Sequence, residues 1–141
     1  MATNQVKIEM ASMSENIAFA RVTVASFAAQ LEFTLAEIEE IKVAVSEAVS
    51  NCIIHGYQNR PDEMVVLQMK IENGEFHLDV EDFGVGITDV EEAMQPAFST
   101  GEERMGLGLV FINSFMNEME LISTPGEGTL VRMVKIPENQ S

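Results

Sequence analysis

The strongest constraint on the fold is a pair of alternating apolar segments on either side of Asn73-Gly74. Asn-Gly between such segments is typical of a two-residue β-hairpin turn. Because side chains alternate between the faces of a strand, the turn also fixes the register. One face of this hairpin is then wholly apolar, and its facing pairs are Ile71 with Phe76, Met69 with Leu78, and Leu67 with Val80. The sequence therefore predicts a sheet with one buried face.

Two segments before the hairpin have helical spacing and possible capping boxes, Ser12 with Glu15 and Thr34 with Glu37. The first predicts a helix with the apolar seam Ile17, Ala20, Val24, Phe27, Ala28 and Leu31. The second predicts a longer helix that ends near His55-Gly56, with the seam Ile38, Ile41, Val45, Ala48 and Cys52. A short strand is expected before them at Val6, Ile8 and Met10.

The second half of the chain is expected to have a loop-rich segment over 82–105, a helix from about Gly108, and two strands over 119–123 and 129–136. The last of these strands is apolar on both of its faces, so the sequence does not decide which face points into the core. These elements predict a single α+β domain over 1–141. We expect a two-layer sandwich with a mixed, mostly antiparallel sheet and helices on one face.

Six of the nine glycines form three Gly-x-Gly pairs, at 84/86, 106/108 and 126/128. Glycine lets the backbone take unusual angles and lets a ligand approach its N–H groups. One such pair is more often a plain turn, but three pairs at the ends of predicted elements indicate one shared pocket. Because Gly106 and Gly108 are expected to precede a helix, its free N–H groups and dipole are expected to bind an anion.

Asp82 continues the inward parity of Phe76, Leu78 and Val80. A carboxylate aimed at the core is costly unless it is paired or hydrogen-bonded. The exocyclic amine of a purine would satisfy it. Capping of the bend at Gly84 is an equally good reading of Asp82 taken alone.

Glu47 and Asn51 lie one helical turn apart and share a face that is flanked by Ala44 and Ile54. An amide oxygen is a suitable ligand for Mg²⁺, and a neighbouring Glu can accept a proton from a nucleophile. Without the glycine pairs, an exposed polar pair on a surface helix would be the better reading. His55 is read as a helix-end residue, because the sequence offers no zinc-like spacing.

Together these residues resemble the GHKL (Bergerat-fold) ATPase and kinase superfamily. Its N box, glycine boxes, lid and Gly-x-Gly-Thr correspond to 47–51 (EAVSN), 82–87 (DFGVGI), 96–105, 106–109 (GLGL) and 126–129 (GEGT). Segments 19–25, 45–51, 53–57 and 95–100 are more narrowly similar to the sporulation anti-sigma F factors. That resemblance implies a homodimeric protein-serine kinase that inhibits a sporulation sigma factor and phosphorylates a serine of an anti-anti-sigma factor.

The resemblance also implies roles for residues at the matching positions. Glu47 becomes the base for the substrate serine, Asn51 the Mg²⁺ ligand, and Asp82 the reader of the adenine amine of ATP or ADP. The other implied nucleotide contacts are Gly84, Gly86, Ser99, Thr100, Gly106, Leu107, Gly108 and Thr129. Arg104 is taken as a catalytic contact of the γ-phosphate, and Arg21 on the first helix as a partner contact.

Four alternatives compete with this function. An ATP-gated inhibitor without significant kinase activity has the same pocket, so the sequence leaves it open. We expect neither the catalytic domain of a histidine kinase nor a DNA-linked ATPase, because 141 residues leave no room for the extra helical hairpin or transducer domain. A domain whose glycines serve only in turns requires the glycine pairs, Asp82 and the Glu47/Asn51 pair to coincide by chance.

Charge limits the partners. The chain has 23 acidic and 8 basic side chains, for a formal net charge of -15. Direct binding of nucleic acid is therefore not expected, and triphosphate binding is expected to depend on Mg²⁺. No apolar run is long enough for a membrane span or resembles a signal. The single cysteine, Cys52, allows no internal disulfide, and the sequence predicts a cytoplasmic protein.

Overall fold

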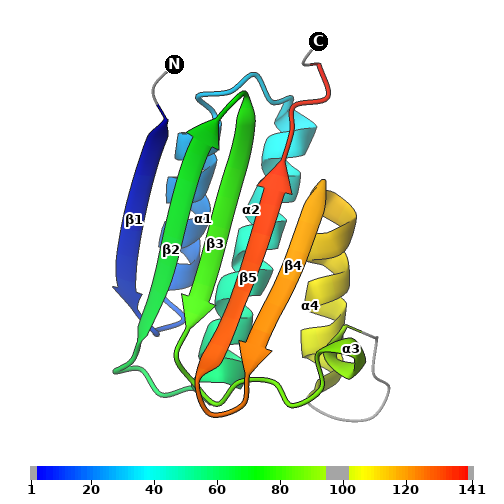
Figure 1. Cartoon of the computed structure of the whole chain (residues 1–141). Helices are drawn as coiled ribbons and strands as arrows, with labels where there is room; N and C mark the ends of the chain where they lie inside the picture. Colours follow the sequence, from blue (N-terminus) through cyan, green and yellow to red (C-terminus); the bar gives the residue numbers. More distant parts are fainter. Residues whose placement is uncertain (1–2, 95–101, 140–141) are drawn as a thin grey trace.

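The computed structural model describes residues 3–94 and 102–139, and of residues 91 and 102–105 it describes the backbone only (Figure 1). The strands are β1 (Asn4–Ala11), β2 (Met64–Glu72), β3 (Glu75–Asp82), β4 (Glu118–Thr124) and β5 (Gly128–Lys135). The helices are α1 (Asn16–Ala28), α2 (Leu35–Asn51), α3 (Val90–Ala93) and α4 (Glu102–Phe115). A π-helical turn, η1 (Cys52–Gly56), follows α2 directly.

The five strands form one sheet in the order β1-β2-β3-β5-β4. Helices α1, α2 and α4 cover one face of this sheet, and the other face is open (Figure 1). The predicted two-layer α+β sandwich is therefore confirmed. The sheet differs from the prediction in one respect, because every neighbouring pair of strands is antiparallel rather than mixed.

The hairpin has the predicted register, with Met69 opposite Leu78 at its centre. Asn73 and Gly74 take φ values of 53° and 76°, which are the left-handed angles that this type of turn needs. The pairing of β3 with β5 also decides the inward face of the last strand. Val131 lies opposite Val80, so Val131 and its neighbour of the same parity, Met133, point into the core.

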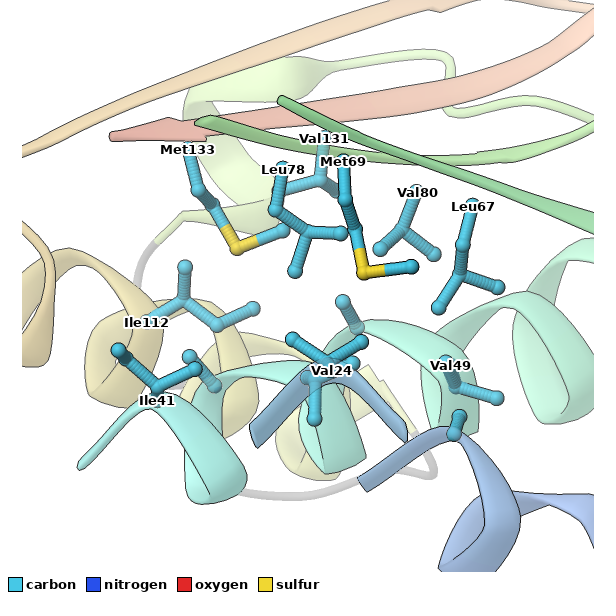
Figure 2. Packing of buried hydrophobic residues seen from close by; sticks show 14 of the residues in the cluster. Val24, Ile41, Val49, Leu67, Met69, Leu78, Val80, Ile112, Val131 and Met133 are labelled. Carbon is cyan, nitrogen blue, oxygen red and sulfur yellow. The ribbon is translucent and has the colours of Figure 1, made fainter. Parts of the chain in front are cut away.

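The core lies between the sheet and the three helices. Figure 2 shows apolar side chains from both layers meeting there, among them Val24, Ile41, Val49, Leu67, Met69, Leu78, Val80, Ile112, Val131 and Met133. Both predicted helical seams pack into this cluster, although Ile17, Leu31 and Ile38 are only partly buried. In the described part of the chain, no helix is both long and apolar enough to cross a membrane.

Only one of the two predicted capping boxes forms. The Thr34 hydroxyl accepts from the Glu37 N–H at 3.1 Å, and the Glu37 carboxylate accepts from the Thr34 N–H at 2.8 Å. The Ser12 box is wrong, because α1 begins at Asn16 without a side-chain cap. The Ser12 hydroxyl is buried and instead donates to the carbonyl of Arg60. A long-range partner thus replaces the local one.

Glu37 links the start of α2 to the end of the chain. Its side chain is buried, and its Oε2 accepts from the Glu138 N–H at 3.0 Å. Burial alone raises the pKa of Glu37, but the hydrogen bonds from Thr34 and Glu138 outweigh it and lower the pKa below the ordinary 4.5. The ionised carboxylate therefore stabilises the folded state above that pH.

Replacing Glu37 with Gln is expected to lower the free energy of unfolding at pH 7 by about 1 kcal/mol, the usual contribution of a cap. The lowered pKa gives the pH dependence: the contribution is present above the unfolded-state pKa and is lost as the pH falls through the folded-state pKa. Urea unfolding of both proteins across this range measures the difference. Glu39→Gln, on the exposed side of α2, is the matched control. An equal loss at pH 3 and pH 7 would contradict the prediction.

Candidate functional site

A pocket opens where η1 and the end of α2 face the ends of β3 and β5. Its polar lining consists of Asn51, Cys52, His55, Asp82 and Thr129. Its remaining walls are formed by Ala48, Gly56, Gly86, Ile87, Leu109, Leu121 and Val131. The structure therefore brings together four of the predicted nucleotide contacts: Asn51, Asp82, Gly86 and Thr129.

Asp82 ends β3, and its side chain points inward as predicted, with only 3% of its surface exposed. The carboxylate accepts from the Gly84 N–H at 2.9 Å, and from the Cys52 thiol and the Thr129 N–H. Burial raises the pKa of Asp82, and these hydrogen bonds lower it only in part. Asp82 thus caps the bend at Gly84 and also contributes a carboxylate to the pocket wall.

Close approach of the backbone explains several glycines around Asp82. A Cβ at Gly56 would lie 2.6 Å from the Asp82 carboxylate, and a Cβ at Gly84 would lie 1.9 Å from the Gly56 carbonyl. A Cβ at Gly128 would lie 2.1 Å from the Asp82 carbonyl, whereas one at Gly126 would meet nothing within 4 Å. Gly56, Gly84 and Gly128 are therefore required by the close packing around Asp82, whereas Gly126 is required by its φ of 82° in the β4–β5 turn.

Glu47 and Asn51 lie on the face of α2 that packs against α4. A Cβ at Gly108 would lie 2.7 Å from Glu47 Oε2 and 3.4 Å from Asn51 Nδ2. Glu47 and Asn51 are both half-buried. Among the described residues, the buried Asn51 Nδ2 has no hydrogen-bond partner. An unsatisfied amide is costly, and its position beside the pocket favours a ligand there.

The expected start of the α4 helix at Gly108 is wrong. The helix begins at Glu102, so Gly106 and Gly108 lie inside it. Helical N–H groups pair with the carbonyl four residues before them, and these two glycines therefore do not offer the free N–H groups expected for an anion. Gly108 instead permits the close approach of α4 to α2.

The remaining predicted contacts are only partly described. Leu107 is 43% exposed on α4. Ser99 and Thr100 lie outside the described residues, as does the side chain of Arg104. Arg21 is half-buried on α1, where its Nε donates to the Ser46 hydroxyl of α2 at 2.9 Å.

Sequence reasoning missed two side chains that support the pocket. The Tyr57 hydroxyl accepts from the Phe83 N–H at 2.8 Å and donates to the Met64 carbonyl, so it fixes the backbone next to Asp82. Burial raises the pKa of Tyr57. The Ser123 hydroxyl accepts from the Ile87 N–H at 2.7 Å. Both contacts join residues far apart in the sequence, and no local pattern indicates them.

Comparison with known proteins identifies the family to which this domain belongs. Residues 10–135 match the family described as the histidine kinase-like ATPase domain. The anti-sigma F factor of Thermoanaerobacter pseudethanolicus is 50% identical over 135 residues, which are 94% of each chain. That of Anoxybacillus flavithermus is 47% identical over 134 residues, 94% of this chain and 92% of the relative. The chain belongs to the anti-sigma F factor family. Membership of this ATPase-domain family implies that it binds nucleotide as an ATP-using, kinase-like domain.

Solved structures show that the anti-sigma F factor family shares its fold with more distant proteins. The RsbU and RsbW domains of a Mycobacterium tuberculosis protein align with a TM-score of 0.69 at 17% identity, over 94% of this chain and 32% of that one. A blue-light activated histidine kinase of Erythrobacter litoralis aligns with a TM-score of 0.59 at 19% identity, over 91% of this chain and 42% of that one. Both likenesses support the GHKL-type fold.

Proposed function

We propose that this protein binds and inhibits a sporulation sigma factor and, with MgATP, phosphorylates a serine of an anti-anti-sigma factor. The observation that carries the proposal is the buried Asp82 carboxylate, set in a pocket with Asn51 and Thr129. The names of the relatives support the sigma-factor partner. A cytoplasmic location follows from this function.

In this proposal Asp82 reads the adenine of ATP or ADP. Its carboxylate already accepts hydrogen bonds from the protein, and a carboxylate has about four acceptor sites in all. The amine of adenine is a donor that suits the remaining capacity. Thr129 lies directly opposite Asp82 in the β3–β5 register, so its side chain supports the same end of the nucleotide. Gly84 and Gly86 lie on the loop that follows Asp82 and are proposed to run along the nucleotide.

The residues beside the pocket fit Mg²⁺. Asn51 lines the pocket, and its amide oxygen is the atom that would hold the cation. Its Nδ2, which has no hydrogen-bond partner among the described residues, is left to donate to the nucleotide. Mg²⁺ usually keeps several waters and is held by one or two protein oxygens together with substrate phosphates. When bound, Mg²⁺ neutralises phosphate charge.

Glu47 is proposed as the general base. It lies one turn before Asn51 on α2 and beside the same Gly108 backbone. A carboxylate there is placed to accept the proton of a substrate serine while the phosphoryl group is transferred. Arg104, Ser99, Thr100 and Leu107 remain proposed contacts of the phosphate end and lid, and Gly106, whose N–H pairs within α4, is proposed only to let the nucleotide approach this helix closely.

Partner binding is proposed to use a homodimer and the α1 surface around Arg21. Phe19 and Val22, next to Arg21, are 55% and 63% exposed on this helix. A net charge of -15 suits the basic surfaces of a sigma factor and disfavours direct contact with nucleic acid. The complex is accordingly expected to weaken as salt is raised.

The test is incubation of the purified protein with γ-labelled ATP, Mg²⁺ and a candidate anti-anti-sigma factor, alongside co-purification with a sigma factor. We expect label on one serine of the anti-anti-sigma factor and retention of the sigma factor. Substitution of that serine by alanine is the control. Nucleotide-dependent retention without transfer would show instead an ATP-gated binding module, and absence of both would reject the proposal.

A further inference from the structure

A row of three inward-pointing polar side chains crosses the pocket end of the sheet. Thr129 of β5 lies opposite Asp82 of β3 on one side and opposite Ser123 of β4 on the other. The next row with the same parity is Val80, Val131 and Leu121, so the change from apolar to polar marks where the core ends and the pocket begins. Asp82 and Thr129 line the pocket, and Ser123 lies behind Thr129.

The Ser123 hydroxyl contacts three groups. It accepts from the Ile87 N–H at 2.7 Å, donates to the Gly128 carbonyl at 3.0 Å, and lies 2.8 Å from the Thr129 hydroxyl. A serine hydroxyl has one proton and two lone pairs. When Ser123 donates to Gly128, the Thr129 hydroxyl donates to Ser123 and turns its own lone pairs to the pocket. When Ser123 donates to Thr129 instead, the Thr129 proton is free for a ligand. Ser123 therefore sets the direction of the Thr129 hydroxyl.

Ser123 also fixes the loop that follows Asp82. Ile87 and Gly86 line the pocket, and the bond to the Ile87 N–H joins this loop to β4. A second hydrogen bond also holds this loop, because the Gly126 N–H donates to the Val85 carbonyl at 2.7 Å. The Ser123 side chain is thus the point at which β4, the Thr129 hydroxyl and the loop of residues 83–87 are held together.

We propose that Ser123 is a positioning residue of the nucleotide pocket, which holds the Thr129 hydroxyl and the Ile87 backbone in place for the ligand. This inference rests on the proposed function, because it takes nucleotide as the ligand of the same pocket. Ser123 itself does not touch the ligand. It acts through Thr129 and through the loop after Asp82.

The experiment measures ATP affinity by isothermal titration calorimetry, with thermal unfolding to confirm that each variant folds. Ser123→Ala removes all three contacts and is expected to weaken ATP binding about tenfold, the effect of losing one well-placed hydrogen bond. Ser123→Thr keeps the hydroxyl and is expected to restore affinity to within about threefold of the natural protein. Thr124→Ala removes the neighbouring hydroxyl, on the exposed side of β4, and is expected to change nothing.

A double-mutant cycle separates positioning from a general loss of structure. If Ser123 acts through Thr129, Ser123→Ala will weaken ATP binding much less when Thr129 is already Val, because the hydroxyl it positions is gone. Ser123→Cys, a weaker hydrogen-bonding side chain, serves the same test if the alanine variant does not fold. Unchanged affinity in Ser123→Ala, or an equal loss in both backgrounds, overturns the inference. Absence of ATP binding by the natural protein overturns the proposed function instead.

Discussion

Glu47→Gln is expected to lower the rate of serine phosphorylation by about 10²- to 10⁴-fold, the usual contribution of a general base. ATP affinity is expected to stay nearly unchanged, because Glu47 is not among the residues that line the pocket around Asp82. Glutamine keeps the size of the side chain beside Gly108, where the space between α2 and α4 is small. The substitution therefore removes the proton acceptor without repacking the helices.

Single-turnover transfer of labelled phosphate, measured beside calorimetric ATP binding, tests this prediction. Glu39→Gln is the matched control, because Glu39 lies two turns earlier on α2 with an exposed side chain. Its transfer rate is expected to equal that of the natural protein. Full transfer by Glu47→Gln or by Glu47→Ala would reject Glu47 as the base. A parallel loss of ATP binding would show that Glu47 serves the nucleotide and not the proton.

Local patterns predicted the parts of the fold that short-range chemistry determines. The Asn73-Gly74 turn fixed the hairpin register, and the Thr34 box fixed the start of α2. The Ser12 box failed because its hydroxyl bonds to Arg60, a partner that only the folded sheet brings near. The predicted start of α4 was wrong for a related reason. The sequence predicts that Gly106 and Gly108 precede the helix, but the Gly108 backbone packs against Glu47, and that packing favours glycine within a helix.

The candidate site was predicted in part for the same reasons. The alternation of side chains along the strand was enough to predict that Asp82 points inward, and helical spacing was enough to predict that Glu47 and Asn51 share a face. The inward face of β5 could not be predicted, because Val131 and Leu130 are both apolar and only pairing with β3 separates them. Ser123 and Tyr57 were missed because each hydroxyl contributes through backbone groups of distant segments. Such contacts leave no periodic signal in the sequence.

Asp82→Asn is expected to weaken ATP binding by about 100-fold, within the range for loss of a hydrogen bond to a charged group. The amide retains one acceptor oxygen, and its NH₂ group faces the donors that the carboxylate now accepts from, Gly84 and Thr129. The loss is expected to be small for a purine triphosphate without the exocyclic amine, because that ligand makes no use of the carboxylate. Calorimetry with both nucleotides measures the difference. An unchanged ATP affinity would remove Asp82 from the adenine site.

The raised pKa of Asp82 adds a second test, because the free energy of unfolding is expected to fall and ATP affinity to rise as the pH increases. Burial raises the folded-state pKa above the ordinary 3.8, so the stability that Asp82 contributes is present below that pH and is lost as the pH rises through the folded-state pKa. Over the same interval the carboxylate becomes ionised and a better acceptor, so ATP affinity is expected to rise. Asp82→Asn should show neither change. Asp79→Asn, three residues earlier on β3 and paired with Arg132 on the open face, should keep both changes. A natural protein whose ATP affinity does not depend on pH across this interval would show that the ionised carboxylate is not what the nucleotide binds.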